Sequence, residues 1–598
     1  MKRVASLYAE LDATTATTAK VEALKSYFAQ AAPADAAWAV YFLAGGKPRQ
    51  VVPTGVLRAL ACEAAGIDDW LFDECYQAVG DLAETISLVL PPPAHESDLG
   101  LAVWIEERLL PLRGLPPETQ AERIRGYWDE LDTPSRFLLA KLIGGAFRVG
   151  VSKLLVQRAL AAHNGVDAKV LAQRMMGYTD GNTPPDATRY LRIVSREPGA
   201  FIEGGQPYPF FLAHPLELPV EEFEARIGPA SDWLVEWKFD GIRAQLVKRD
   251  GQVWIWSRGE ELITERFPEV VAIGAALPDG CVLDGEIVVW RDDRPAPFAL
   301  LQQRIGRKTL TKKVLADAPV TFLAYDLLEW QGEDVRSRPQ RERRVLLEAA
   351  QTEANRAVLQ TLPLVMDEAL VGNASADEVA ADTRIASAAH LRLSPLQSRP
   401  TWAELAVLRE EARERGVEGF MLKNAGAEYG VGRTKADGTW WKWKIDPYSV
   451  DAVLIYAQRG HGRRASVYTD YTFAVWSRTP LDAAEAQAVV EAIERREPPQ
   501  PDALQLVPFA KAYSGLTDEE FARIDSVIRK TTLEKFGPVR SVKPSLLFEL
   551  GFEGINRSAR HKSGIAVRFP RMLRIRDDKP LHEADTLQTL ELLLGGNA

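Results

Sequence analysis

The stretch from Trp233 to Gln245 constrains the fold more than any other part of the chain. Apolar and charged side chains alternate along its first half, and alternate side chains of a strand point to opposite faces. The pattern therefore predicts a strand with one buried and one charged face. Gly241 follows, where a side chain would obstruct a bend or a closely approaching ligand. The apolar face carries Val235, Trp237 and Phe239, and the charged face carries Glu236, Lys238 and Asp240.

A lysine between two carboxylates has two interpretations. A lone Lys-x-Asp-Gly string most often marks a surface strand with a salt-bridged lysine, since short motifs match by chance. The string here is longer, because a glutamate precedes the lysine and Arg243, a planar cation suited to phosphate, follows it. The whole string, Glu236-x-Lys238-x-Asp240-Gly241-x-Arg243-Ala244, resembles the active-site signature of the covalent nucleotidyltransferases, the ATP-dependent DNA ligases above all.

Length and composition fit a multidomain globular protein. The chain has 598 residues, 46% of them hydrophobic and 26% charged, which predicts about two to four domains. It has no apolar run of about 18 residues, as a membrane span requires, and its first residues lack the apolar core of a signal peptide. Three scattered cysteines are too few for a disulfide framework or a four-cysteine zinc site. We therefore expect a cytoplasmic protein with no membrane contact, and the resemblance to DNA ligases implies association with the nucleoid.

Residues 1–197 are rich in Ala and Leu, with apolar side chains at three- and four-residue spacing, which predicts an all-α domain. Within it, glycines interrupt residues 141–153, where they permit the close approach of another group. Ser152 is expected to cap the next helix, whose N-terminus would favour a phosphate. Glycine caps with solvated charges explain the segment equally well. The layout resembles the helical DNA-binding domain of large ATP-dependent ligases, which implies DNA contacts by Arg148, Ser152 and Lys153.

Residues 198–446 bring prolines, aromatic residues and alternating strands. An Asp-Gly pair at 250–251 between two alternating runs predicts a β-hairpin, which returns Arg258 beside the lysine strand. Asp284 and Glu286 share one face of the next predicted strand. Two carboxylates in line suit Mg²⁺, although charge that keeps an edge strand soluble is the plainer explanation.

Two further strands carry candidate residues. Residues 320–328 are expected to form a buried strand, in which Tyr325 is either a core residue or a platform for a base. In the run Thr439-Trp-Trp-Lys-Trp-Lys, the tryptophans at 441 and 443 face inward and Lys442 and Lys444 share the other face. Two lysines on one face repel each other, unless a polyphosphate lies over them.

The order of these motifs resembles that in the ATP-dependent DNA ligases, and the resemblance implies a role for each residue. It identifies Lys238 as the catalytic nucleophile that receives AMP from ATP. Arg433 fits less well, because the loop before Lys442 is longer than usual. The resemblance implies nucleotide contacts by Glu236, Arg243, Arg258, Glu286, Tyr325, Arg433, Lys442 and Lys444, and metal contacts by Glu286, Glu418 and Asp240.

From residue 447 to 598 short strands, glycine turns and a single helix over about 517–535 are typical of a five-stranded OB barrel. The net charge of −10 does not by itself indicate nucleic-acid binding, but DNA affinity depends on local basic surface. Such a surface is expected in residues 557–579, where Asp577 and Asp578 are the only carboxylates. The end of this segment resembles the terminal ligase motif, which implies DNA or pyrophosphate contacts by Arg571, Arg574, Arg576 and Lys579.

The sequence thus predicts three domains, namely helical, α+β adenylation and OB-fold, in an ATP-dependent DNA ligase acting on nicked double-stranded DNA. ATP is the expected cofactor, with Mg²⁺ or else Mn²⁺. Nearby cations, Lys442, Lys444 and Mg²⁺, are expected to lower the pKa of Lys238 so that it attacks uncharged. An RNA ligase, a capping guanylyltransferase, an NAD⁺-dependent ligase and a catalytically dead DNA-binding scaffold are the alternatives. We expect a monomer, and any helicase or nuclease partner is invisible in the sequence.

Overall fold

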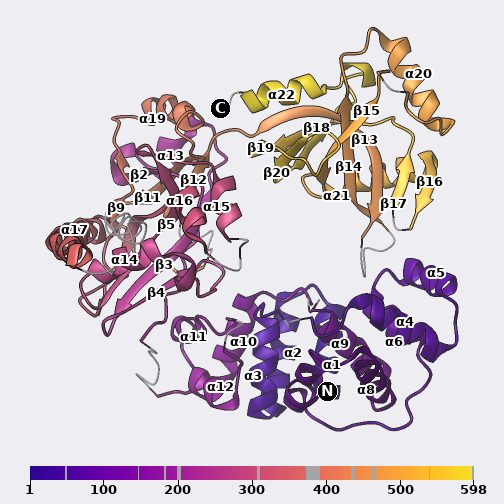
Figure 1. The fold of residues 1–598 in the computed structure, drawn as a ribbon, viewed down its shortest axis with the longest axis horizontal. Helices are drawn as coiled ribbons and strands as arrows, with labels where there is room; N and C mark the ends of the chain where they lie inside the picture. The colour runs from indigo at the N-terminus through magenta and orange to yellow at the C-terminus, as the bar shows by residue number, and fades with distance from the viewer. Residues whose placement is uncertain are drawn as a thin grey trace. The chain divides into compact units, whose positions relative to one another are not determined.

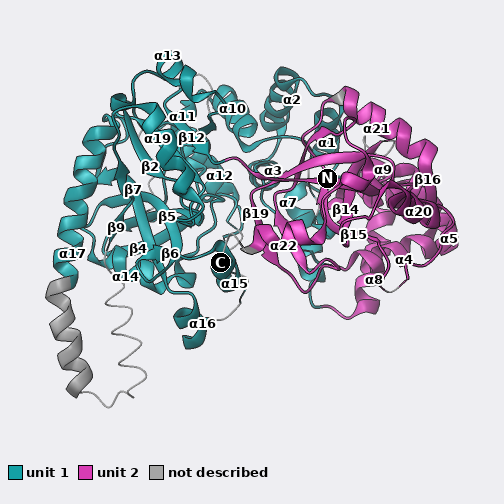
Figure 2. Cartoon of the chain, turned by 90° about the horizontal axis from the view of Figure 1, so that it is seen from above, with its two compact units in different colours: residues 1–51, 98–114, 142–445 teal, residues 52–97, 115–141, 446–598 magenta. Residues whose placement is uncertain are grey.

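The computed structural model describes residues 1–47, 50–145, 147, 149–180, 183–197, 204–305, 307, 310–371, 391–432, 438–460, 467–500, 502–537 and 539–595. They form two compact units, coloured teal and magenta in Figure 2, and neither is continuous in sequence. None of the helices in these ranges has the length and apolarity that crossing a membrane requires. Unit 1 comprises residues 1–51, 98–114 and 142–445, and unit 2 comprises residues 52–97, 115–141 and 446–598.

The N-terminal part of unit 1 is helical, as the periodicity predicts (Figure 1). The predicted cap of α10 is confirmed, because the Ser152 hydroxyl accepts a hydrogen bond from the Leu155 N–H at 3.3 Å. Apolar side chains such as Leu11 and Leu24 are fully buried between these helices. The helices are α1 Lys2–Ala13, α2 Thr17–Gln30, α3 Pro33–Leu43, α7 Leu101–Val103, α10 Lys153–Asn164, α11 Ala168–Arg174 and α12 Ala187–Val194.

The larger sheet of unit 1 has seven strands within the described residues. The predicted hairpin at 250–251 is confirmed: both residues have positive φ, and Arg249 is in register with Gln252. Helices α14 Pro268–Ala276 and α17 Gln340–Val371 pack on this sheet (Figure 1). The strands are β4 Gln252–Ser257, β3 Ile242–Arg249, β5 Cys281–Arg291, β7 Val320–Trp330 and β8 Glu333–Asp334, with β6 Arg294–Pro295 paired to β5 and β9 Arg392–Leu393 paired to β7.

A second sheet, of five strands within the same ranges, carries the lysine strand. Antiparallel pairing puts β2 and β12 on either side of β11. One hydrophobic cluster joins the two sheets, since it contains Val247 and Val282 of the first and Trp440 of the second. The residues that follow β2 therefore lie where the sheets meet. The strands are, in order, β1 His214–Pro215, β12 Trp440–Lys444, β11 Gly419–Asn424, β2 Trp233–Trp237 and β10 Leu396–Gln397.

The C-terminal part of unit 2 is built around β13 Tyr448–Arg459, which pairs antiparallel with three other strands. Its buried core includes Tyr471, Phe473 and Phe548. The other strands are β14 Tyr468–Trp476, β15 Leu506–Ala512, β16 Thr532–Phe536, β17 Val539–Val542, β18 Leu547–Phe552, β19 Gly554–Arg557, β20 Ile565–Arg568 and β21 Arg571–Ile575. The helices of unit 2 are α4 Thr54–Ala65, α5 Asp69–Val79, α6 Leu82–Val89, α8 Pro117–Asp129, α20 Ala483–Glu494, α21 Asp518–Thr531 and α22 Leu587–Gly595. Helix α9 Thr133–Gly144 begins in unit 2 and ends in unit 1.

The prediction of a single C-terminal helix over 517–535 is wrong in number and in length. Among the described residues after 447 there are three α-helices, and the predicted one, α21, ends at Thr531. The hydroxyls of Thr531 and Thr532 donate to carbonyls one turn earlier, at 2.8 and 2.7 Å. The chain then continues as β16, which pairs with β17 around Gly537 at a positive φ of 56°. This hairpin, and not helix propensity, sets the end of α21.

Candidate active site

Lys238 follows β2 directly and is fixed by backbone pairing to β11. Its N–H donates to the Gly419 carbonyl and its own carbonyl accepts from the Glu418 N–H, both at 2.8 Å. Behind it, Trp237 packs against Phe420 with ring centroids 4.4 Å apart, and Val235 and Phe239 share the same buried core. The predicted division of the strand into two faces is confirmed.

The side chain of Lys238 forms an ion pair inside the site. Its Nζ lies 2.6 Å from Glu418 Oε2, and the Nζ of Lys444 lies 3.3 Å from the same oxygen. The side chains of Lys238 and Glu418 are about four-fifths buried, with 23% and 18% exposed. Strand alternation on β12 thus brings a second lysine to the carboxylate that holds the first.

Gly241 has a packing requirement that the sequence pattern only partly anticipates. A Cβ at this position would overlap the Ile287 carbonyl oxygen and come within 2.8 Å of Glu286 Cγ. The obstruction that the structure shows is the backbone of β5. Without a side chain at 241, β5 approaches closely enough for Glu286 to act electrostatically on Lys238.

The electrostatics around Lys238 correct one expectation. Burial lowers the pKa of Lys238, but the carboxylates of Glu418, Glu286 and Asp240 outweigh burial and raise it above the ordinary value. The prediction that neighbouring cations lower this pKa is therefore wrong for the protein by itself, since the groups that act on the amine are acidic. Burial in turn raises the pKa of Glu286 to about 7, although Lys238 and Arg243 oppose the shift.

Arg243 is held by a buried carboxylate on the neighbouring strand. Its Nη2 lies 2.7 Å from Asp284 Oδ2, and the Tyr429 hydroxyl donates to the same oxygen at 2.6 Å. Asp284 is fully buried. The expectation that Asp284 and Glu286 form a pair suited to a cation is therefore wrong for Asp284, whose charge is neutralised by the guanidinium. Arg243 gains a fixed orientation from this contact.

Glu236 lies fully inside the protein, with 2% of its surface exposed. Its carboxylate pairs with Lys423 Nζ at 2.9 Å and with Arg344 Nη1 at 3.4 Å. The sequence analysis predicts neither of these two partners of Glu236. Lys423 directly follows the apolar run 420–422 of a predicted strand, which was a usable signal, whereas Arg344 lies on α17 with no local signal.

Tyr325 lies under two cations. Lys423 Nζ is 4.3 Å from its ring centroid and Arg243 Cζ is 5.8 Å from it. Lys423 also donates to the Tyr325 carbonyl at 2.9 Å. Burial raises the pKa of the Tyr325 phenol well above its usual range, so the ring is a neutral aromatic surface. Tyr325, Glu236 and Lys423 thus belong to one connected group.

The remaining residues predicted to contact the nucleotide lie on β12, after β4, and outside the described residues. Lys442 is in register with Met421 on β11, two residues before Lys444, and both lysines are half-buried. The N–H of Arg258 donates to the Arg243 carbonyl at 2.9 Å, so the hairpin returns Arg258 to the lysine site as predicted, and its side chain is exposed. Arg433 lies outside the described residues.

The carboxylates offer a partial site for a metal ion. In the described ranges, no group of three or more His, Cys, Asp or Glu side chains is arranged to hold one. Glu286 and Glu418 nevertheless both act on Lys238, as does Asp240. Mg²⁺ commonly binds through one or two carboxylates together with substrate phosphates. The residues present fit such an ion when a phosphate completes its shell.

The predicted DNA contacts of the helical region divide into three cases. Arg148 lies outside the described residues. Ser152 caps α10. Lys153 forms an ion pair with Glu260 and donates to the Met175 carbonyl at 3.2 Å. The Lys153 ammonium group is therefore already paired with a carboxylate inside unit 1.

The basic segment around β21 is less basic than its sequence suggests. Arg576 and Lys579 pair with Asp451 of β13 at 3.0 and 2.7 Å. Arg574 pairs with Glu549 of β18 at 2.6 Å, and Arg571 is exposed at the start of β21. The expectation that two aspartates alone face these cations is wrong, because neighbouring strands supply further carboxylates.

Comparisons with known proteins agree with this geometry. The family described as "ATP dependent DNA ligase domain" matches residues 211–444, and that described as "DNA ligase N terminus" matches residues 1–161. The chain is 31% identical to a "Probable DNA ligase" of Koribacter versatilis, over 99% of this chain and 96% of the relative. It is also 31% identical to a "Probable DNA ligase" of Opitutus terrae, over 98% of this chain and 62% of the relative.

Among solved structures, one titled "Pmar-Lig_PreS3" has a TM-score of 0.55 at 14% identity, covering 96% of this chain and 99% of that one. At that identity the likeness concerns the fold. The family matches and the near full-length relative carry the identification. The chain belongs to the ATP-dependent DNA ligases.

Proposed function

We propose that this ligase seals nicks in duplex DNA, joining a 5′-phosphate to a 3′-hydroxyl, and that Lys238 carries AMP between ATP and DNA. The observation that carries the proposal is the Lys238–Glu418 ion pair at 2.6 Å, with Lys444 on the same carboxylate. An enclosed amine next to a proton acceptor and a second cation suits a nucleophile that acts on a phosphate.

In the first step, Lys238 Nζ attacks the α-phosphorus of ATP, and an N–P bond forms as the bond to pyrophosphate breaks. The amine must first lose a proton, and Glu418 Oε2 is within reach of it. We assign Lys442 and Lys444 to the α-phosphate. In-line transfer at phosphorus depends mainly on positioning and on charge neutralisation, which these residues supply.

We assign the metal to Glu286 and Glu418, with Asp240 as a further candidate ligand. When bound, Mg²⁺, or Mn²⁺ in its place, would neutralise phosphate charge. The adenine end of the nucleotide is assigned to Tyr325, whose ring offers a stacking surface, and to Glu236. Arg433 stays a prediction for the nucleotide.

In the second step, the 5′-phosphate of the nick attacks the AMP phosphorus, the N–P bond breaks, and Lys238 is regenerated. The 3′-hydroxyl then attacks the activated 5′-phosphate, a phosphodiester forms, and AMP leaves. We assign Arg258 to the 5′-phosphate, because its side chain is exposed while its backbone is bonded to Arg243. Arg243 is assigned to the nucleotide.

We further propose three functional regions: residues 1–197 for DNA binding, with Arg148 and Ser152 as contacts, 198–446 for adenylation, and 447–598 as an OB-fold. Arg571 would contact DNA or pyrophosphate directly, and Arg574, Arg576 and Lys579 would exchange their carboxylate partners for the same ligands. We propose a monomer in the cytoplasm, near the nucleoid, and leave helicase or nuclease partners open.

A labelling experiment tests the role of Lys238. With α-labelled ATP and Mg²⁺, the protein should become covalently labelled and the label should move to nicked DNA. Lys238→Ala should abolish labelling entirely, since no other amine replaces the nucleophile. Lys248→Ala, near the end of β3, where Nζ donates to the Gly251 carbonyl of the hairpin turn, is the control and should label normally. Label retained by Lys238→Ala would refute the assignment.

Substrate choice is tested separately. Nicked DNA with ATP should be sealed, while nicked RNA, GTP, or NAD⁺ in place of ATP should give little product. Efficient sealing of nicked RNA would favour an RNA ligase instead.

A further inference from the structure

The Arg258 loop, residues 257–261, has a backbone that closes on itself. The Glu260 N–H donates to the Ser257 carbonyl at 2.8 Å and the Ser257 N–H donates to the Glu261 carbonyl at 3.0 Å. Glu260 adopts a positive φ of 61°, a conformation uncommon outside glycine and asparagine. Such backbone strain persists when surrounding contacts fix it, so the contacts of Glu260 are informative.

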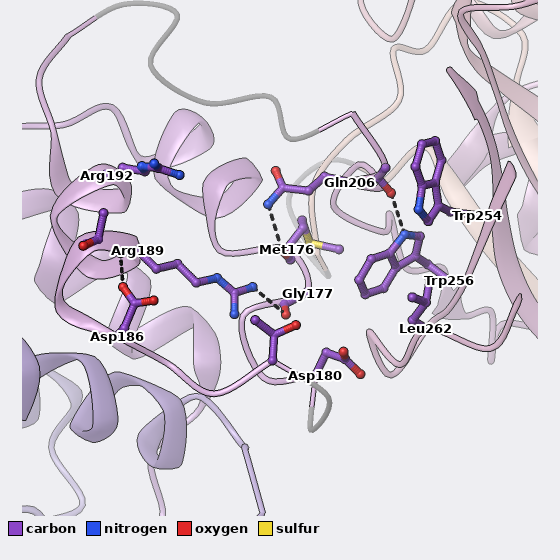
Figure 3. Close-up of a pocket in the computed structure, with 13 residues that line it drawn as sticks. Met176, Gly177, Asp180, Asp186, Arg189, Arg192, Gln206, Trp254, Trp256 and Leu262 are labelled. Carbon is purple, nitrogen blue, oxygen red and sulfur yellow. Dashed lines mark hydrogen bonds between the residues drawn. The ribbon is translucent and has the colours of Figure 1, made fainter. Parts of the chain in front are cut away.

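Those contacts lead to a second loop, the hub turn, residues 175–178, which follows α11. Side chains from several elements bind its backbone carbonyls, as Figure 3 shows in part. They are Lys153 on Met175 at 3.2 Å, Gln206 on Met176 at 3.4 Å and Arg189 on Gly177 at 2.9 Å. Gly177 itself has a positive φ of 69°, and a Cβ there would come within 2.7 Å of the Trp256 ring. The hub turn is therefore a fixed anchor against the end of β4.

Glu260 joins the Arg258 loop to this anchor. Its carboxylate forms an ion pair with Lys153 Nζ and accepts a hydrogen bond from the Gly177 N–H at 3.3 Å. The Lys153 and Glu260 side chains are only 20% and 15% exposed. A largely buried pair of this kind is costly to break by removing one partner, because the other charge is left unpaired.

Close packing alone does not fix the C-terminal end of the Arg258 loop, next to Leu262. Met176 and Gly177 of the hub turn, with Trp256 and Leu262, line a cavity of about 600 Å³ (Figure 3). Leu262 comes directly after the Arg258 loop and pairs with Trp256 across that loop. Since one side of this pair faces the cavity, the polar contacts of Glu260 supply the constraint that close packing gives elsewhere.

We propose that Glu260 is a positioning residue for nick sealing: with Lys153 and the Gly177 N–H it forms a latch that fixes the Arg258 loop to the helical region. The latch orients Arg258 for the 5′-phosphate and ties that orientation to the helices α10 to α12. The inference rests on the proposed assignment of Arg258. It also gives Lys153 a definite role within the protein.

The main test uses Glu260→Gln, which keeps an oxygen for the Gly177 N–H and removes the charge facing Lys153. Lysyl-AMP formation should change by less than about threefold, because Lys238 is held by β11, and this readout also reports folding. Single-turnover transfer of AMP from pre-adenylated protein to a nick should fall by about tenfold or more, as misplacement of a positioned group commonly costs. Glu261→Gln, at the exposed neighbouring carboxylate, should leave both rates unchanged.

Two combined variants separate positioning from general structure. In Arg258→Ala/Glu260→Gln the second change should add almost nothing to the first, since residues that act as a unit are not additive. The charge reversal Lys153→Glu/Glu260→Lys restores the ion pair but not the hydrogen bonds to the Gly177 N–H and the Met175 carbonyl, so it should recover only part of the transfer rate. Because lysyl-AMP formation reports folding separately, a recovery of transfer without a change in lysyl-AMP formation reflects positioning.

The outcomes distinguish this inference from the proposed function. If Arg258→Ala abolishes transfer while Glu260→Gln transfers at the normal rate, the latch is refuted and the assignment of Arg258 stands. If Arg258→Ala itself transfers normally, that assignment is wrong and the latch falls with it. Multiplicative losses in the double variant would also overturn the latch.

Discussion

The Lys238 site and the surface of α21 both pair cations with carboxylates, but at different depths. Arg243 and Asp284 are enclosed, with 13% and none of their side-chain surface exposed. Arg523 and Asp577 of unit 2 make an equally short contact of 2.6 Å with about half of each side chain in solvent. The two ion pairs have similar N–O distances and differ in how far their side chains are exposed to solvent.

Solvent exposure decides how much free energy is lost when such an ion pair is broken. Removing one partner of a buried pair typically costs about 3–5 kcal/mol, because the remaining charge stays desolvated. An exposed pair is worth about 0–1 kcal/mol, because water replaces the partner. Arg243 is therefore fixed in advance of its ligand, and Arg576 and Lys579, with only 16% and 23% of their side chains exposed, are held in a similar way by Asp451. Exposed cations, such as Arg523 on Asp577 and Arg574 on Glu549, can leave their carboxylates for a phosphate. The following variants test that contrast.

The largest effect is expected for Asp284→Ala. It leaves the Arg243 guanidinium buried without its carboxylate and removes the acceptor of the Tyr429 hydroxyl. We expect a loss of about 3–5 kcal/mol in the free energy of unfolding. Urea unfolding with an unchanged slope would measure it. A loss below about 1 kcal/mol would show that the enclosed pair behaves like an exposed one.

A smaller effect is expected for Gly241→Ala, which tests how closely β5 must approach the lysine strand. The added Cβ would overlap the Ile287 carbonyl oxygen, and overpacking of this kind typically costs about 1–3 kcal/mol. Lysyl-AMP formation should slow as Glu286 moves. Gly259→Ala is the control for stability, because the nearest atom to its Cβ, Ser257 Oγ, is 3.6 Å away. Equal stability of the two variants would contradict the packing argument.

The sequence predicts the strands of this site well because strand alternation is local. Val235, Trp237 and Phe239 enter the core as the two-residue period requires, and the Asp-Gly turn has the backbone that its residues favour. The cap at Ser152 follows from the same kind of short-range chemistry. Each of these features depends on residues within a few positions of one another.

Partners distant in sequence were not predicted. Lys423 lies 187 residues from Glu236, and Glu260 lies 107 residues from Lys153. A local sequence pattern does not predict which distant carboxylate will pair with a buried cation. The same limit explains the wrong expectation for the pKa of Lys238, which is raised by Glu418, just before β11, and by Glu286 on β5.

The smallest effect is expected for Asp577→Asn, which removes the carboxylate that faces Arg523 in the exposed pair. We expect less than about 1 kcal/mol of lost stability. Salt should shrink the difference further, since exposed charges are screened over about 10 Å at 0.1 M ionic strength. The loss from Asp284→Ala, measured in the same salt series, should hardly change, because a buried pair is poorly screened. If the two losses instead respond equally to salt, depth does not separate the two pairs, and the reason for treating Arg243 as fixed and exposed cations such as Arg523 as exchangeable disappears.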